Sequence, residues 1–173
     1  MRFGQYVVGE FFDEMFSENG SPRAAARTLF ANIEALPEGE LVNRQKAADL
    51  ALLHMGITFN VYGEHAGTEK IFPFDLVPRI VPPAEWSHIE KGLKQRIHAL
   101  NLFINDLYHD QKIFKDGVVP AEIVLSSKAF RKQCMGFNPP RGIWCHVTGT
   151  DLVRHRDGQI YVLEDNLRCP AGV

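Results

Sequence analysis

The hydrophobic pattern is strongest between Pro83 and Tyr108, where apolar residues recur every three or four positions. This spacing places them on one side of a helix, so it predicts a long core helix over this range. The stripe consists of Trp86, Ile89, Leu93, Ile97, Leu100, Ile104 and Leu107. His88, His98 and His109 lack the spacing of a helical metal-binding pair, so we expect exposed or structurally satisfied histidines.

Two shorter helices are predicted before this one. Ser21-Pro22 is typical of a helix start, and apolar spacing continues the helix to Leu36. A second helix is expected from Pro37 to Met55, with Gly56 as its C-terminal cap. The apolar positions expected to face inward are Leu29, Ile33 and Leu36 in the first helix and Leu41, Ala48, Leu52 and Met55 in the second. A strand follows at 57–61, before a Gly-rich turn around Glu64 and His65.

Several polar residues between these elements have two interpretations each. They are Asp13, Glu14, Asp75, Arg79, Asn101 and Asn105. The first two are expected to be a solvated pair, with contact to a substrate as the alternative. The next two either bind substrate or form a buried ion pair. The two asparagines share one face of the long helix and are expected at the surface, with ligand contact as the alternative.

Composition indicates a globular protein, with 45% hydrophobic and 23% charged residues in one expected domain, residues 1–173. A net charge of −2 with scattered basic residues gives no argument for nucleic-acid binding. Three cysteines without C-x-x-C spacing argue against a disulfide framework or a zinc ribbon. No segment approaches the roughly 18 apolar residues of a membrane span. A soluble cytoplasmic protein is therefore expected.

The last part of the chain predicts a β-hairpin. Asp157-Gly158 lies between two apolar runs and is a favoured pair for a two-residue turn. Before the hairpin, residues 143–149 are expected to form a strand that continues into its first strand. Counting outward from the turn predicts the pairs Arg156 with Gln159, Arg154 with Tyr161, Leu152 with Leu163, and Asp151 with Glu164. A three-residue loop would shift Asp151 away from Glu164.

The predicted register places three oxygen-bearing side chains together. Asp151 and Glu164 lie across the ladder from each other, and Asn166 shares the face of Glu164 while Asp165 points the other way. Opposed carboxylates repel, and a divalent cation relieves that repulsion. Oxygen ligands suit Mg²⁺ or Mn²⁺ better than zinc. The alternative is a solvated hairpin with an acidic end.

Four segments of the sequence resemble those of a known family. GITFNVYG, EKIFPFDLVPRIVP, GLKQRIHALNLFINDLYHDQKIFKDGVVP and LEDNLRCPAG together resemble circularly permuted ATP-grasp proteins related to glutathionylspermidine synthase, from about Phe12 to Val173. The resemblance implies an ATP-dependent carboxylate-amine ligase that acts through an acyl phosphate on small-molecule or peptide substrates. By the same match, Asp151, Glu164 and Asn166 are the expected metal ligands.

The resemblance also sets the expected fold and its extent. It implies an α+β protein with a mixed or antiparallel sheet and flanking helices, and it places the adenine-binding strands beyond Val173. The chain is thus expected to be the front part of such a protein, completed by a missing lobe or a partner chain. Arg168 continues the ligand face if the strand persists, and it would then stabilise the transferring phosphate or the acyl phosphate. A non-catalytic binding module or an inactive remnant is the competing interpretation, and a metal-dependent hydrolase ranks last because no nucleophile is evident.

Overall fold

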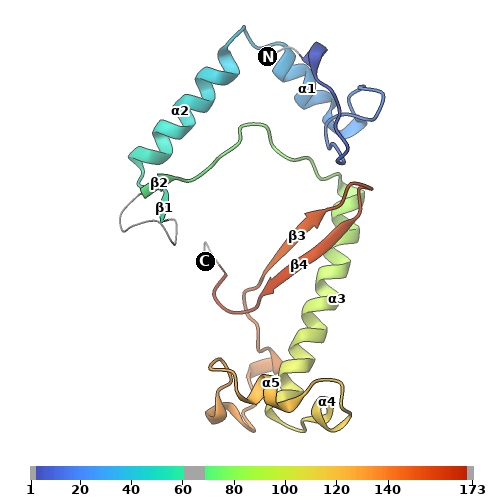
Figure 1. Cartoon of the computed structure of the whole chain (residues 1–173), viewed down its shortest axis with the longest axis vertical. Coiled ribbons are helices and arrows are strands. Elements are labelled where there is room, and N and C mark those ends of the chain that lie inside the picture. Colours follow the sequence, from blue (N-terminus) through green and yellow to red (C-terminus); the bar gives the residue numbers. More distant parts are fainter. Residues whose placement is uncertain (1–2, 61–68, 171–173) are drawn as a thin grey trace. The chain divides into compact units, whose positions relative to one another are not determined.

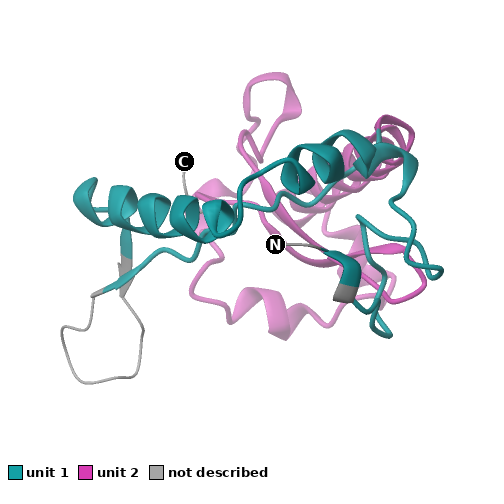
Figure 2. Ribbon diagram, turned by 90° about the horizontal axis from the view of Figure 1, so that it is seen from above, with its two compact units in different colours: residues 1–82 teal, residues 83–173 magenta. Residues whose placement is uncertain are grey.

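The computed structural model describes residues 3–60 and 69–170, and the chain divides into two compact units, Met1–Pro82 and Pro83–Val173 (Figure 2). The described residues form helices and two short antiparallel strand pairs, joined by turns and irregular segments, which confirms a mixed α+β composition (Figure 1). The elements are α1 Arg27–Glu34, α2 Glu40–His54, β1 Thr58–Asn60, β2 Glu69–Ile71, α3 Pro83–Tyr108, α4 Lys112–Lys115, α5 Ala121–Leu125, β3 Gly149–Arg154 and β4 Ile160–Asn166. That the chain forms one domain stays a prediction.

The first unit is built around a small aromatic core. Met15, Phe16, Ala26 and Ile33 are buried there, and the rings of Phe3 and Phe16 meet edge to face with centroids 5.2 Å apart. Half-buried side chains complete the cluster: Val8, Leu29, Phe30, Leu41, Val77 and Ile80. This core joins the N-terminal segment to α1 and to the segment that precedes Pro82.

The predicted start of α1 was wrong. The Ser21 backbone N–H donates to Asn19 Oδ1 at 3.0 Å, and Arg23 is extended with ψ of 150°. Arg23 is held there because its Nε–H donates to the carbonyl oxygens of Asp13, at 2.7 Å, and Phe16, at 3.0 Å. A 3-10 turn at Ala24–Ala26 follows, so the α-helix begins only at Arg27.

Helix α2 confirms the predicted end of the second helix. Gly56 has φ of 68° and its N–H donates to the Leu53 carbonyl at 3.0 Å, as in a glycine C-cap. Of its predicted inner positions, Leu41, Ala48 and Leu52 are half-buried, whereas Met55 is 64% exposed. β1 pairs with β2 after the helix, and the expected turn around Glu64 and His65 lies outside the described residues.

Helix α3 has the predicted bounds. Ile89 and Leu107 of the apolar stripe are buried, but Trp86 at its start is 52% exposed, so the prediction for that residue was wrong. No helix in the described part of the chain is long and apolar enough to cross a membrane.

The end of α3 fixes the segment before β3. Asn101 Oδ1 accepts the backbone N–H groups of Trp144, at 2.7 Å, and Cys145, at 3.1 Å, while the Trp144 indole donates to Asn105 Oδ1 at 3.2 Å. Both asparagines are therefore half-buried, contrary to the expected surface position. Because these bonds use backbone groups that a ladder would need, the strand predicted over 143–149 begins only at Gly149.

The β3–β4 hairpin has a different turn from the predicted one. The Gly158 N–H donates to the His155 carbonyl at 2.9 Å, His155 pairs with Gln159, and Gly158 has φ of 87°. These features define a three-residue loop with glycine in the left-handed position. The pairs expected for Arg156, Arg154 and Leu152 were therefore wrong, since Arg154 pairs with Ile160 and Leu152 with Val162.

The β3–β4 hairpin lies beside α3 (Figure 1). Two ion pairs attach the hairpin to this helix. Near the turn, the Arg154 guanidinium donates to both carboxylate oxygens of Glu85, at 2.5 and 2.9 Å, and its side chain is only 6% exposed. At the other end of the ladder, Arg96 Nε donates to Asp165 Oδ2 at 2.6 Å. These bonds fix which face of the hairpin lies against the helix.

We predict that Glu85→Gln lowers the free energy of unfolding by about 2 kcal/mol, because it removes the carboxylate charge that pairs with the largely buried guanidinium of Arg154. The hydrogen bond from Arg154 lowers the pKa of Glu85 below its ordinary 4.5, against the opposing effect of burial. A lowered folded-state pKa stabilises the protein above pH 4.5, and that contribution is lost as pH falls through the folded-state pKa. The difference between wild type and variant in urea unfolding should therefore shrink in acid.

The matched control is Glu90→Gln, which breaks an exposed pair with Lys94 on the same helix. An exposed pair of this kind contributes less than about 1 kcal/mol, so unfolding should change little. Equal losses for the two variants would contradict the proposed role of the Glu85–Arg154 pair.

Candidate metal site at the end of the hairpin

A β-bulge determines the faces of the hairpin. The register shifts between Asp151 and Leu152, which leaves Leu163 of β4 unpaired and 70% exposed. The three-residue loop alone would oppose Asp151 with Leu163, and the bulge adds the residue that moves Glu164 into that place. The predicted pairing of Asp151 with Glu164 is confirmed, by a route that the sequence analysis did not foresee.

The bulge also separates two kinds of carboxylate. Thr150 and Asp165 oppose each other on the face toward α3, where Thr150 Oγ1 donates to Asp165 Oδ1 at 3.0 Å. The Asp165 side chain is only 9% exposed and pairs with Arg96. Asp151 and Glu164 occupy the opposite face and are exposed. Asp165 is thus neutralised within the protein, while the other two carboxylates face outward.

Asn166 lies beside Glu164, as strand alternation predicts. Its Nδ2 donates to Glu164 Oε1 at 3.2 Å, so both side chains are on one face. In this rotamer the amide presents its N–H₂ group, and a role as metal ligand requires the amide to turn so that Oδ1 faces the ion.

The donor set fits a hard divalent cation. Two carboxylates and one amide supply only oxygen ligands, which are those of Mg²⁺ or Mn²⁺. Within residues 3–60 and 69–170, no group of three or more His, Cys, Asp and Glu side chains is arranged to hold a metal. That result excludes a zinc-type cluster there, and it leaves open a site in which substrate phosphates complete the coordination.

The chain turns back directly after Asn166. β4 ends there, Cys169 has φ of 49°, and Pro170 lies over Gly149, where a Cβ atom would stand 2.8 Å from the Pro170 Cβ. The strand does not persist to Arg168, so alternation no longer assigns that exposed side chain to the ligand face. The role of Arg168 stays a prediction.

Gly149 occupies a position beside the candidate site where only a glycine fits, and the sequence analysis missed it. The absence of a side chain permits the segment after the ligands to pack on the start of β3, next to Asn166. A glycine at the first residue of a strand was the available signal, but only the structure shows what approaches it.

Comparison with known proteins identifies the family. The model of the circularly permuted ATP-grasp type 2 family matches residues 78–173, more than half of the chain. The chain therefore belongs to the circularly permuted ATP-grasp type 2 family, which confirms the resemblance.

The relatives are longer proteins. An uncharacterized protein of Synechocystis sp. is 49% identical over 173 residues, which are 100% of this chain and 36% of the relative. An uncharacterized protein of Mycobacterium leprae is 41% identical over 99% of this chain and 30% of its own length. A protein of Frankia alni named putative glutamate–cysteine ligase 2-3 is 39% identical over 94% of this chain and 18% of its own length. The chain thus spans about a third or less of these relatives.

We predict that Gly149→Ala lowers the free energy of unfolding by about 1–3 kcal/mol, because the new methyl group must displace Pro170 or distort the strand. Gly92→Ala is the matched control, since a Cβ there meets nothing within 4 Å and lies within α3. The control should gain about 0.5–1 kcal/mol from helix propensity. Urea unfolding measures both, and similar gains in the two variants would show that the close approach at Gly149 is absent.

Proposed function

We propose that the chain is part of an ATP- and Mg²⁺-dependent carboxylate-amine ligase that acts through an acyl phosphate, with a circularly permuted ATP-grasp fold. The observation that carries the proposal is the outward-facing pair Asp151 and Glu164 with Asn166 beside it. Family membership supports the reaction class, since ATP-grasp proteins use ATP and a divalent metal.

In this proposal the protein supplies position and charge. Bound Mg²⁺ would neutralise the phosphate oxygens while a substrate carboxylate attacks the γ-phosphorus and ADP leaves. The carboxylates of Asp151 and Glu164 would hold the ion, and Asn166 would add a neutral oxygen that does not increase the negative charge. The amine substrate then attacks the acyl carbon, and phosphate leaves.

The substrates are a small carboxylic acid or peptide and an amine. The name of the Frankia relative describes the joining of glutamate to cysteine, which is a reaction of this class. This chain spans only 18% of that relative, so the name supports the class of reaction and not the particular acid and amine.

A binding module without catalysis is the second candidate. It is favoured by α2, where no residue is buried and Val42, Leu50 and Leu53 are each about half exposed. An apolar helix face of this kind is typical of a surface that another protein segment covers. Metal binding separates the two candidates, because a pure interaction module has no need of the carboxylate pair.

We predict that Mn²⁺ binds the 173-residue chain and that Asp151→Asn or Glu164→Gln each weakens this binding about tenfold or more, since each removes one of two charged ligands. Titration of the free Mn²⁺ signal by electron paramagnetic resonance measures the affinity. Asp110→Asn is the control, because it removes an exposed carboxylate that pairs with Lys112 in the same unit. The proposal fails if Mn²⁺ does not bind, or if all three variants bind it like the wild type.

We further predict that Arg168→Ala lowers catalysis about 100-fold in the native gene product that contains this chain, as expected for a group that stabilises the transferring phosphate. Hydroxamate formation from ATP, glutamate and hydroxylamine reports acyl-phosphate formation without knowledge of the natural amine. The Mn²⁺ affinity of the variant should stay within about threefold of wild type, because a guanidinium is not a metal ligand. Equal losses of catalysis and of metal binding would contradict this role.

A further inference from the structure

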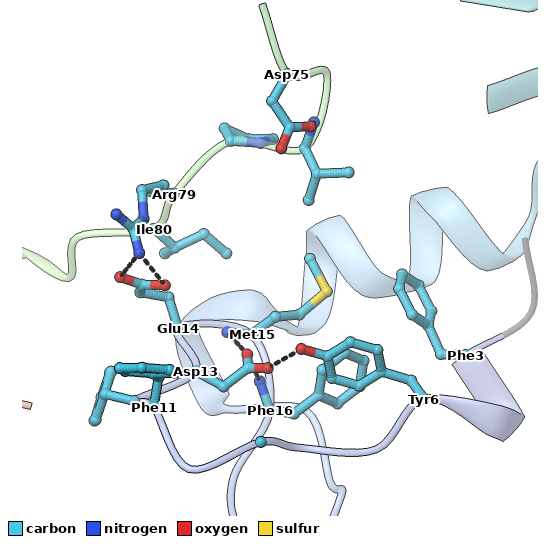
Figure 3. Close-up of a pocket in the computed structure, with 14 residues that line it drawn as sticks. Phe3, Tyr6, Phe11, Asp13, Glu14, Met15, Phe16, Asp75, Arg79 and Ile80 are labelled. Atoms are coloured by element: carbon cyan, nitrogen blue, oxygen red, sulfur yellow. Dashed lines mark hydrogen bonds and ion pairs between the residues drawn. The ribbon is translucent and has the colours of Figure 1, made fainter. Parts of the chain in front are cut away.

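A cavity of about 510 Å³ lies within the first unit, between the N-terminal segment and residues 75–80 (Figure 3). Its volume falls within the range of about 300–1,000 Å³ that is usual for small-molecule sites. The apolar lining includes Phe3, Tyr6, Phe12, Met15, Phe16 and Ile80. Met15 and Phe16 are buried core residues, so this wall is part of the folded core of the unit.

Hydrogen bonds to Asp13 hold one wall of the cavity in place. Asp13 accepts hydrogen bonds from the Tyr6 hydroxyl at 2.5 Å and from the backbone N–H groups of Met15 and Phe16 at 2.8 Å each (Figure 3). Burial raises the pKa of Asp13, but these hydrogen bonds outweigh it and keep the pKa below its ordinary value. Asp13 is therefore an ionised structural residue, contrary to the expected solvated one.

An ion pair lies at the edge of the same cavity. Arg79 Nη2 contacts Glu14 Oε1 at 3.2 Å and Oε2 at 3.5 Å (Figure 3). The side chain of Glu14 is only 15% exposed, whereas that of Arg79 is 76% exposed. Because the guanidinium is mostly in water, its pairing with Glu14 is weak and it can swing outward at little cost. The carboxylate has much less freedom.

We propose that this cavity binds an α-amino acid with a large apolar side chain. The ammonium group would pair with Glu14, the carboxylate with Arg79, and the side chain would enter the aromatic cavity. The two protein charges are in direct contact, and an α-amino acid carries its ammonium and carboxylate groups on the same carbon atom, so it can insert between the two side chains and pair with both. The inference concerns a site in the first unit and does not rest on the proposed ligase function.

Related ligands satisfy the charges less well. An arylalkyl carboxylate would pair with Arg79 but would leave the mostly buried Glu14 beside a second negative charge, which is unfavourable. An arylalkyl amine would pair with Glu14 and release Arg79 to water, so it keeps one charge interaction of the two. The expected order of affinity is therefore amino acid, amine, carboxylate.

Isothermal titration of the native gene product with L-phenylalanine, phenethylamine and hydrocinnamate tests this order. EDTA is present and ATP is omitted, so the result is independent of the metal site. Phenylalanine should bind about tenfold or more tightly than phenethylamine, as expected for one added charged hydrogen bond, and hydrocinnamate should bind more weakly still. No binding of phenylalanine, or equal affinity for phenylalanine and phenethylamine, would overturn the inference.

Variants locate the binding in this cavity. Glu14→Gln and Arg79→Gln should each weaken phenylalanine binding about tenfold or more, with circular dichroism as the check that each variant is folded. Arg44→Gln is the matched control, because Arg44 forms an exposed ion pair with Glu40 in the same unit, at 2.7 Å, and does not line the cavity. Unchanged affinity in folded Glu14→Gln and Arg79→Gln proteins would place any binding elsewhere and overturn the assignment.

Discussion

The bulge at Leu163 is the constraint on which the candidate metal site depends. A hairpin with a period of two assigns every side chain to one of two faces, so one additional residue exchanges the faces for everything beyond it. Here the bulge follows a three-residue loop and sends Glu164 and Asn166 outward while Asp165 turns toward α3. Without it, the residue opposite Asp151 would be a leucine.

The face toward α3 shows why this arrangement is stable. Arg154 pairs with Glu85 and Asp165 with Arg96, so the buried charges of the hairpin are neutralised at both ends of the ladder. Loss of register would break both ion pairs on a face where Arg154 and Asp165 are largely buried, which costs more than the pairs themselves contribute. The ion pairs therefore stabilise one strand register of the hairpin, and in that register Asp151 lies opposite Glu164.

The spacing of apolar residues and the capping residues predicted those elements that depend on interactions between neighbours in the sequence. α3 follows directly from its apolar stripe, and the end of α2 from Gly56. The sequence did not predict the late starts of α1 and β3, because these depend on side-chain bonds to backbone groups outside each element, from Arg23 to Asp13 and from Asn101 to Trp144. The pairing of Asp151 with Glu164 was predicted through a two-residue turn, and two departures, the longer loop and the bulge, cancel. Family resemblance carried the choice of ligands, which register alone could not make.

The two candidate sites differ in the sign of their charge pairs, and this difference determines what each can bind. At the hairpin two carboxylates oppose each other, so a divalent cation gains from both and a monovalent anion from neither. At the cavity a carboxylate touches a guanidinium, so a ligand with one charge must break the pair and can replace only half of it. A zwitterion replaces both halves. Each site draws its residues from one unit, and each can therefore be tested without reference to the other.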